Sequence, residues 1–543
     1  MKNINPEKLS KEETEKTKKA SIVEGSAYNV MYGFGEQYVT PYAIKLGATD
    51  SQIGILSSVP TFIGSLFQIL GAKLTEKYQD RKSICLIFAL LQALMLLPLF
   101  VVPLFTRSML LLTIIFSLYL IFANIGGPPW NSWIGDVILE DDREKYFAKR
   151  NKISIAVLFI SVLIAGIILN YFSDVDIWIG FGILFVVAFT GRVVSWYSLA
   201  KQYEPRFVFK SESYFSFRDF IKKMPETNFG NFVIFRSIMA FTIMIASPFF
   251  AVYMLKDLNF TYIQYTAIIL VPMIIKILTA TFWGKYSEKL GNKRIMFISA
   301  FMIAFIPLGW FAAGYFFESS KYIFLILMAV ECINGLGWGG FDLTTFNYML
   351  ETSGPQKRAR AFAYFNVIFG LFVLLGGLLG AYLINIIPNI LVGGIMISAI
   401  LTVFFISAIA RGIIPFIFIK KMREVRVNKP LSERKIFFDI FVGKPLHAAI
   451  SHTEYTLDVA EKNIESMRQN TKDTLEILAK PIEPIIKEME EFIDEGLEKV
   501  EPIRKRLEPR IIRKTKKRHH DKIIGHTPKR LRIQKIVKSR KKR

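Results

Sequence analysis

The stretch Leu46–Lys82, LGATDSQIGILSSVPTFIGSLFQILGAKLTEKYQDRK, returns in altered form as Leu258–Arg294, LNFTYIQYTAIILVPMIIKILTATFWGKYSEKLGNKR. The two copies align without a gap at a constant offset of 212 residues, which pairs Thr49 with Thr261 and Glu76 with Glu288. Each copy is a turn, an apolar run of about 20 residues, a short charged loop and a second apolar run, which is typical of two membrane-spanning helices. The chain is therefore a duplicated unit, and six helices in each copy predict twelve.

The overall composition agrees with a membrane protein. Of 543 residues, 52% are hydrophobic, and the apolar runs are too long for a soluble globule. Both cysteines, Cys85 and Cys332, fall inside apolar runs, so the sequence predicts neither a disulfide framework nor a metal site.

Apolar periodicity gives the predicted spans. We expect membrane helices at 21–45, 52–72, 83–103, 109–135, 153–173, 176–200, 231–254, 262–284, 295–317, 322–348, 360–386 and 390–418.

The distribution of Lys and Arg gives the orientation. The amino-terminal tail and the loops after every second helix hold most of the basic residues, whereas the opposite loops hold four, Lys45, Arg107, Lys256 and Lys321. Because cytoplasmic loops retain positive charge, both termini are predicted to be cytoplasmic in a multi-pass protein of the cell membrane. The first apolar run contains Glu24 and Glu36 and has no small-residue cleavage site, so it is not a secretory signal.

The charged loops carry a family resemblance. Residues Gly284–Arg294, GKYSEKLGNKR, resemble the loop between helices 8 and 9 of the major facilitator superfamily. The first copy keeps the charges but has Ala72 and Gln79 where the pattern has glycine, so the sequence does not predict the tight turn there. The resemblance spans roughly residues 20 to 420 and implies an all-α transporter of prokaryotic type with two pseudo-symmetric six-helix halves, of no assigned subfamily.

A second resemblance lies after the fourth helix. Residues Gly126–Asp136, GGPPWNSWIGD, resemble the loop between helices 4 and 5 of prokaryotic facilitators, and a half-repeat runs from Gly339 to Asn366. We expect paired charges in these loops to form a cytoplasmic gate when that side is shut; charged loops that only pin helix ends to the interface are the alternative. The predicted gate residues are Glu24, Glu76, Lys77, Arg81, Lys82, Asp136, Arg143, Glu288, Lys289, Lys293, Arg294 and Arg358.

Polar residues within the spans are the candidates for a substrate or proton pathway, because a charge at membrane depth costs a few kcal/mol unless it faces a cavity or a partner. The resemblance implies that helices 1, 4, 7 and 10 line a central cavity. The predicted pathway residues are Glu36, Asn124, Arg236, Lys276, Glu331, Trp338 and Asp342.

Helical geometry suggests pairs among these residues. Glu331 and Asp342 are eleven residues apart, which returns to within about 20° of the same helix face. Glu331 could pair with Lys276, and Glu24 could pair with Arg236, its equivalent in the other half.

No catalytic motif accompanies these charges. The sequence contains no nucleotide loop, zinc signature or nucleophile elbow, so we expect neither an enzyme nor a bound cofactor. The predicted function is secondary active transport of a small polar or ionic solute by alternating access, coupled to protons, with the chain acting as a monomer in the bilayer. The alternative is a membrane-anchored tether or sensor with a facilitator-like core.

The domain boundaries follow from these patterns. We expect an amino-terminal tail at 1–20, six-helix halves at 21–200 and 231–420, and a linker at 201–230 that contains a short amphipathic helix on the inner leaflet. Residues 421–543 form a cytoplasmic extension with 32 basic and 19 acidic residues. Apolar heptads from Ile482 and many prolines predict a mostly helical or disordered tail, which could bind anionic lipid or nucleic acid.

Overall fold

The computed structural model describes residues 9–138, 140–205, 216–353, 358–392, 395–418 and 420–425. The predicted extension therefore lies outside the described residues, apart from its first few positions. The amino-terminal half contains α1 (Lys11–Phe34), η1 (Glu36–Tyr38), α2 (Val39–Lys45), α3 (Asp50–Tyr78), α4 (Arg81–Thr106), α5 (Met109–Val137), α6 (Glu140–Phe172) and α7 (Ile177–Ala200).

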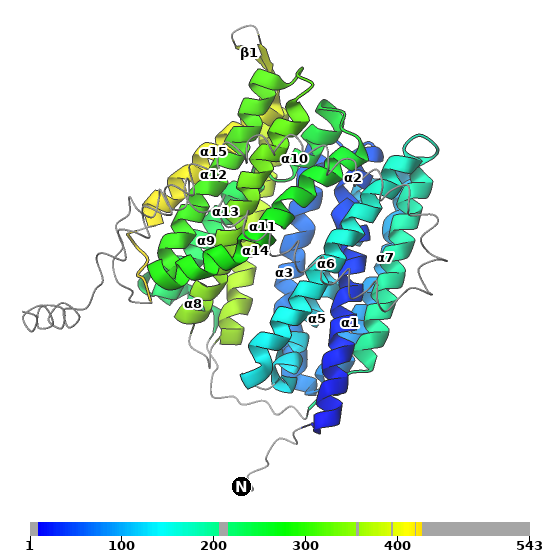
Figure 1. The fold of residues 1–543 in the computed structure, drawn as a ribbon, viewed down its shortest axis with the longest axis vertical. Coiled ribbons are helices and arrows are strands. Elements are labelled where there is room, and N and C mark those ends of the chain that lie inside the picture. The colour runs from blue at the N-terminus through cyan, green and yellow to red at the C-terminus, as the bar shows by residue number, and fades with distance from the viewer. Residues whose placement is uncertain are drawn as a thin grey trace, which may run out of the picture. The chain divides into compact units, whose positions relative to one another are not determined.

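The carboxy-terminal half repeats this order after a linker (Figure 1). The linker contains α8 (Phe217–Lys223) and η3 (Met224–Glu226). The second half contains α9 (Asn228–Met244), α10 (Phe249–Val252), the π-helix η4 (Tyr253–Asp257), α11 (Tyr262–Leu290), α12 (Asn292–Phe317), α13 (Ile323–Thr352), α14 (Arg358–Ile386), β1 (Ile390–Val392), β2 (Ile395–Ile397) and α15 (Ala399–Phe418).

The duplication is visible in α3 and α11. Both helices have 29 residues, and both begin with a capping box, made by Thr49 with Gln52 and by Thr261 with Gln264. In each box the Thr hydroxyl oxygen accepts a hydrogen bond from the backbone N–H of the Gln. The Gln side-chain oxygen in turn accepts one from the backbone N–H of the Thr. The same local sequence therefore starts the same helix in each half.

Eleven helices in the described ranges are long and apolar enough to cross a membrane by length and composition. The twelfth crossing runs from α1 to α2 and is broken at Gly35, where η1 intervenes. The first helix of the second half is broken at the equivalent place, between α9 and α10, just before Pro248. Proline cannot donate to the helix ladder, which accounts for this second break.

The structure corrects the expected turn after α3. Gln79 adopts a left-handed conformation with φ of 54°, in the place that Gly291, with φ of 89°, occupies after α11. Both helices therefore end at a residue with positive φ, but ψ is 23° at Gln79 and 152° at Gly291, so the two turns differ. A side chain in the left-handed conformation costs about 1 kcal/mol or more.

The structure also corrects the start of the last helix. Residues 390–397, predicted to be helical, include an antiparallel strand pair in which Ile390 faces Ile397, and α15 begins only at Ala399. A short apolar run cannot be assigned to strand or helix from its periodicity alone, and the β-branched Ile and Val residues favour the strand.

Part of the apolar face of the linker helix α8 packs on protein. Phe220 of α8 is buried against Phe229 and Tyr364, with ring centroids 6.1 and 5.6 Å apart, whereas Ile221 is exposed. One side of α8 therefore rests on the carboxy-terminal half.

Within the described ranges, the two halves share an apolar core at one end of the helices. We call the end with α8 and the start of α1 the linker end, and the end with β1 and β2 the hairpin end (Figure 1). The largest cluster of buried residues joins both halves and includes Tyr38, Tyr42, Phe249 and Tyr265. Among the described residues, the clusters nearer the linker end belong to one half each.

Candidate functional site

Arg81 organises the linker end of the amino-terminal half. Its side chain is fully buried, 2.5 Å from Asp136 and 2.8 Å from Glu204, and it also donates to the Pro205 carbonyl oxygen. These partners come from its own half and the start of the linker. Arg81 and Asp136 thus hold helix ends together within the amino-terminal half. Their part in a gate between the halves when that end is shut stays a prediction.

A carboxylate after the last helix of each half caps the third helix of that half. Glu204 accepts from the backbone N–H groups of Arg81 and Lys82, and Glu424 accepts from the backbone N–H of Lys293 at 2.9 Å. The first N–H groups of a helix lack partners within it and favour a negative charge. The backbones of Lys82 and Lys293, two predicted gate residues, therefore take part in this repeated cap.

One predicted gate residue does contact the other half. Glu76 at the end of α3 accepts from Arg360 of α14 at 3.0 Å. Of the other predicted gate residues, Lys77 lies over the Tyr78 ring, the Lys82 ammonium donates to the Gln202 carbonyl oxygen, and Glu288 and Lys289 are exposed. Arg294 shares the Glu424 cap through its backbone. The side chains of Arg143 and Arg358 lie outside the described part of the chain.

The hairpin end is closed by contacts that the sequence did not reveal. The Lys256 ammonium lies 2.8 Å from Asp50 and donates to the Ala48 carbonyl oxygen. The hydroxyls of Tyr38 and Thr266 lie 2.9 Å apart in the shared apolar core. Both contacts join the two halves.

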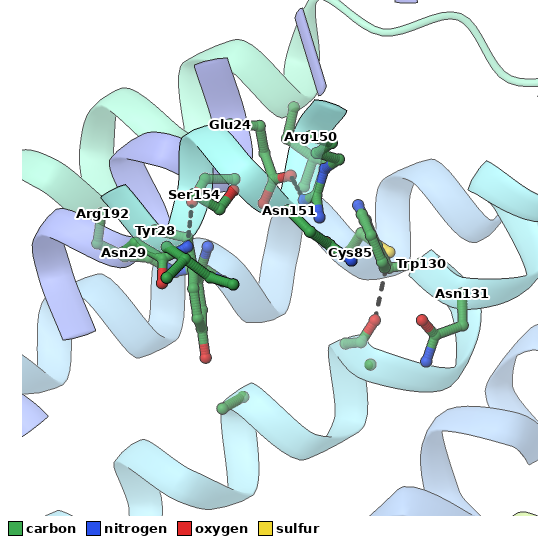
Figure 2. A pocket seen from close by; sticks show the side chains of 16 residues that line it. Glu24, Tyr28, Asn29, Cys85, Trp130, Asn131, Arg150, Asn151, Ser154 and Arg192 are labelled. Atoms are coloured by element: carbon green, nitrogen blue, oxygen red, sulfur yellow. Dashed lines mark hydrogen bonds and ion pairs between the residues drawn. The ribbon is translucent and has the colours of Figure 1, made fainter. Parts of the chain in front are cut away.

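A pocket of about 450 Å³ lies within the amino-terminal half. Figure 2 shows Arg192 and Tyr28 on one side of it, Trp130 on the other, and the pair of Glu24 and Arg150 between them. The Glu24 carboxylate and the Arg150 guanidinium are 2.9 Å apart, and that guanidinium stacks on the Trp130 ring at 4.7 Å. Glu24 thus lines the pocket, and its part in a cytoplasmic gate stays a prediction.

This pairing corrects the expectation that Glu24 meets Arg236. Arg236 instead lies between the rings of Phe341 and Phe369, at 5.0 and 4.8 Å from their centroids. Equivalent sequence positions indicate equivalent places in the two halves, but they do not bring side chains into contact.

Sequence reasoning missed Arg192, although the signal was present. Arg192 lies within the predicted span 176–200, where a charge is as costly as it is at the predicted pathway residues. The guanidinium donates to Ser195 and lies over the Tyr28 ring at 5.1 Å. Tyr28, Asn29 and Ser154 also line the pocket and carry no charge that would have marked them.

In the carboxy-terminal half, Lys276 of α11 and Asp342 of α13 form an ion pair at 2.5 Å. Their side chains are 47% and 39% exposed, although both lie well inside membrane-spanning helices. Trp338, one turn before Asp342, packs on Phe341 with ring centroids 5.8 Å apart.

Glu331 is separated from that pair. It is 6% exposed and accepts hydrogen bonds from the Trp310 indole at 2.8 Å and from Asn334 at 2.6 Å. Among the described residues Glu331 has no ion-pair partner, so the expected pairing with Lys276 is wrong. Although Glu331 and Asp342 are close in helical angle, α13 packs between α11 and α12, and the two carboxylates contact different neighbours.

Two further predicted residues make neutral contacts. Glu36 accepts from the Tyr119 hydroxyl at 3.2 Å, at the break of the first helix. Asn124 accepts from Gln68 at 2.6 Å, and Gln68 accepts in turn from Asn366 at 2.8 Å. This amide chain joins the two halves through α3 and α14.

Comparison with known proteins agrees with this architecture. The family model described as Major Facilitator Superfamily matches residues 26–236 and 232–452. No curated protein matches the chain.

The chain is similar in fold to several solved transporters. A mutant of the nucleoside transporter NupG is 14% identical with a TM-score of 0.60, over 75% of this chain and 100% of that one. The POT family transporter PepTSo is 11% identical with a TM-score of 0.58, over 75% and 97%. A bacterial homolog of the human lysosomal transporter Spinster, inward-facing and unoccupied, is 14% identical with a TM-score of 0.52, over 77% and 100%.

Proposed function

Because the chain belongs to the major facilitator superfamily and is a multi-pass membrane transporter, we propose that it moves a small polar or ionic solute by alternating access, coupled to protons. In this proposal the two halves rock about a site near the middle of the membrane, as the duplication leads us to expect. The linker end is cytoplasmic, because the loops there hold most of the basic residues.

Two observations support a cavity between the halves. The halves share an apolar core at the hairpin end, whereas the clusters nearer the linker end belong to one half each. The half-exposed pair of Lys276 and Asp342 lies at membrane depth, where an exposed charge is tolerated if it faces a water-filled cavity. This arrangement supports a cavity between the halves that opens toward the linker end.

The ion pair of Glu76 and Arg360 keeps one side of that end closed. It already spans α3 and α14, and the amide chain through Gln68 runs between the same two helices. We propose that these two helices act as the fixed side of the cavity. The contacts between α6 and α11, such as the hydrogen bond from the Ile263 N–H to Asn170, lie near the hairpin end. We infer that α6 and α11 are apart at the linker end, so the cavity opens on their side.

Glu331 is the proposed proton carrier. Its carboxylate is buried without a cation among the described residues, and its two hydrogen-bond donors are neutral. An ionised carboxylate taken out of water costs several kcal/mol unless it is paired, which favours binding of a proton here. Glu36, with its neutral Tyr119 partner, is the alternative carrier.

Uptake into proteoliposomes tests the transport function. Vesicles that contain the full chain are incubated with pooled metabolites, and their contents are identified by mass spectrometry with and without a pH gradient. We expect at least one small polar solute to accumulate, and to accumulate more with the gradient. Contents identical to those of empty vesicles would contradict transport, and accumulation that ignores the gradient would contradict coupling.

A further inference from the structure

Three hydrogen-bond donors around the pocket of the amino-terminal half have no partner within the described part of the chain. They are the Arg192 Nε, the Trp130 Nε1 and the Ser154 hydroxyl, and all three residues line the pocket. Arg192 and Ser154 are 8% and 7% exposed. Most buried polar groups in proteins are hydrogen-bonded, so three unpaired donors around one cavity indicate a missing acceptor.

A second buried arginine in the chain makes the contrast. Arg411 of α15 is 2% exposed, and it donates from Nε to the Ser407 hydroxyl and from a terminal nitrogen to the Ile243 carbonyl oxygen. Arg411 thus has the bonding of a structural arginine. Arg192 donates from one terminal nitrogen to Ser195 but leaves Nε unpaired.

The charge of the pocket specifies the acceptor. Its lining residues include two guanidinium groups, those of Arg150 and Arg192, and one carboxylate, that of Glu24. Glu24 already pairs with Arg150, which leaves one positive charge over. A ligand with one negative charge would balance the pocket, whereas a phosphate group, with about −1.5 to −2 at pH 7, would exceed it.

The size of the pocket limits the rest of the ligand. A volume of about 450 Å³ lies within the range of roughly 300 to 1,000 Å³ typical of small-molecule sites. The pocket therefore suits a metabolite of ordinary size.

We propose that this pocket binds the carboxylate of a small organic acid, with Arg192 as the cation and with Trp130 and Ser154 as neutral donors. The identification of this acid as the transported solute rests on the proposed function. The stacking of Trp130 on Arg150 holds the indole ring in place, and the pair of Arg150 with Glu24 leaves Arg192 as the group that meets the ligand.

Thermal stabilisation of the purified full chain in detergent tests the proposal. The probes are the acids benzoate, nicotinate and pyruvate, their neutral amides benzamide, nicotinamide and pyruvamide, and inorganic phosphate. We expect at least one acid to raise the melting temperature in a saturable way, and its matched amide to have no effect. Equal responses to acid and amide, a response to phosphate alone, or no response to any acid would overturn the proposal.

Variants assign the effect to the pocket. Arg192→Gln should raise the half-saturating concentration of the acid by about tenfold or more, since hydrogen bonds to charged groups are among the stronger ones. Trp130→Phe keeps a ring on Arg150 but removes the donor, and should raise it by about threefold or more. If Arg192→Gln does not fold, the half-saturating concentrations of the acid for Trp130→Phe and Ser154→Ala still test the proposal.

The matched control is Arg107→Gln. It removes an exposed arginine that directly follows α4, at the end of this helix away from the pocket. It should leave the response unchanged. Retention of the native response in the pocket variants would place the acid elsewhere and overturn the proposal. Binding and transport fail separately: an acid that binds without flux in proteoliposomes contradicts the transport function, whereas flux of a solute that does not need Arg192 contradicts only the carboxylate site.

Discussion

Lys256 pairs with Asp50 at 2.8 Å across the two halves, at the end of the helices where their apolar cores merge. Each side chain is about one-third exposed. An exposed ion pair contributes roughly 0 to 1 kcal/mol. If the halves alternate as proposed, the pair adjusts the balance between the two conformations, while the shared apolar core supplies most of the closure at this end.

Removal of this pair should open the hairpin end. Asp50→Asn is expected to raise the population open at that end by up to about fivefold, since 1 kcal/mol corresponds to about that factor. A cysteine at Thr266, which is buried between the halves, reports the opening through its rate of labelling in a chain with Cys85→Ala and Cys332→Ala. Asp174→Asn, an exposed carboxylate at the same end, is the control, and an equal labelling rate in both variants would contradict the assignment.

The pair of Glu76 and Arg360 should act in the opposite sense. Glu76→Gln is expected to weaken closure of the linker end and to increase labelling of a cysteine at Asn131, which lines the pocket. The exchange Glu76→Arg with Arg360→Glu should restore the native rate, because the charges still meet. Lys73→Gln, an exposed change on the same helix, should have no effect. A swapped variant as accessible as Glu76→Gln would assign these residues to folding.

Arg81 should matter for stability. Arg81→Met leaves the Glu204 carboxylate, which is 15% exposed, without its side-chain partner. Removal of one member of a buried pair costs roughly 3 to 5 kcal/mol. We expect a clear loss in the melting temperature of the detergent-solubilised protein, against little change for Arg107→Met at an exposed site. Similar melting temperatures for the two variants would mean that the linker does not need this anchor.

The variant Glu331→Gln should distinguish proton coupling from solute binding. Glu331→Gln keeps an acceptor for Trp310 or Asn334 but cannot release a proton. Solute exchange between equal pools needs no net proton movement, so exchange should persist while uptake driven by a pH gradient is lost. The same assays on Glu36→Gln test the alternative carrier. Native gradient-driven uptake by Glu331→Gln would exclude Glu331 as the carrier, and loss of both activities would indicate a role in binding or folding.

The sequence predicted the repeat and its elements better than it predicted contacts. The offset between Thr49 and Thr261 placed two helices correctly, because capping and apolar length are local properties. The turn at Gln79 and the strands before α15 differed, because a left-handed residue and a β-branched run are settled by their surroundings. Local patterns thus gave the order of the helices.

Pairing of charges could not be predicted in the same way. Glu24 meets Arg150 and not Arg236, because the partner depends on how α1 packs against α6. Arg192 was overlooked within an otherwise apolar span, and its open Nε appears only when its neighbours are known. Helical spacing locates a side chain on its own helix but does not identify what lies opposite.

We propose that the two ends of the helices open and close in opposition. Spin labels at Lys77 and Lys289 report the linker end, and labels at Lys45 and Asp257 report the hairpin end; each pair consists of exposed residues at equivalent positions of the two halves. Distances from pulsed electron resonance are compared between the otherwise native chain and the same chain with Asp50→Asn, which needs no knowledge of the solute. In the variant, the distance between 45 and 257 is expected to lengthen while the distance between 77 and 289 shortens. Two distances that lengthen together, or a hairpin end that opens while the linker end stays unchanged, would contradict alternating access.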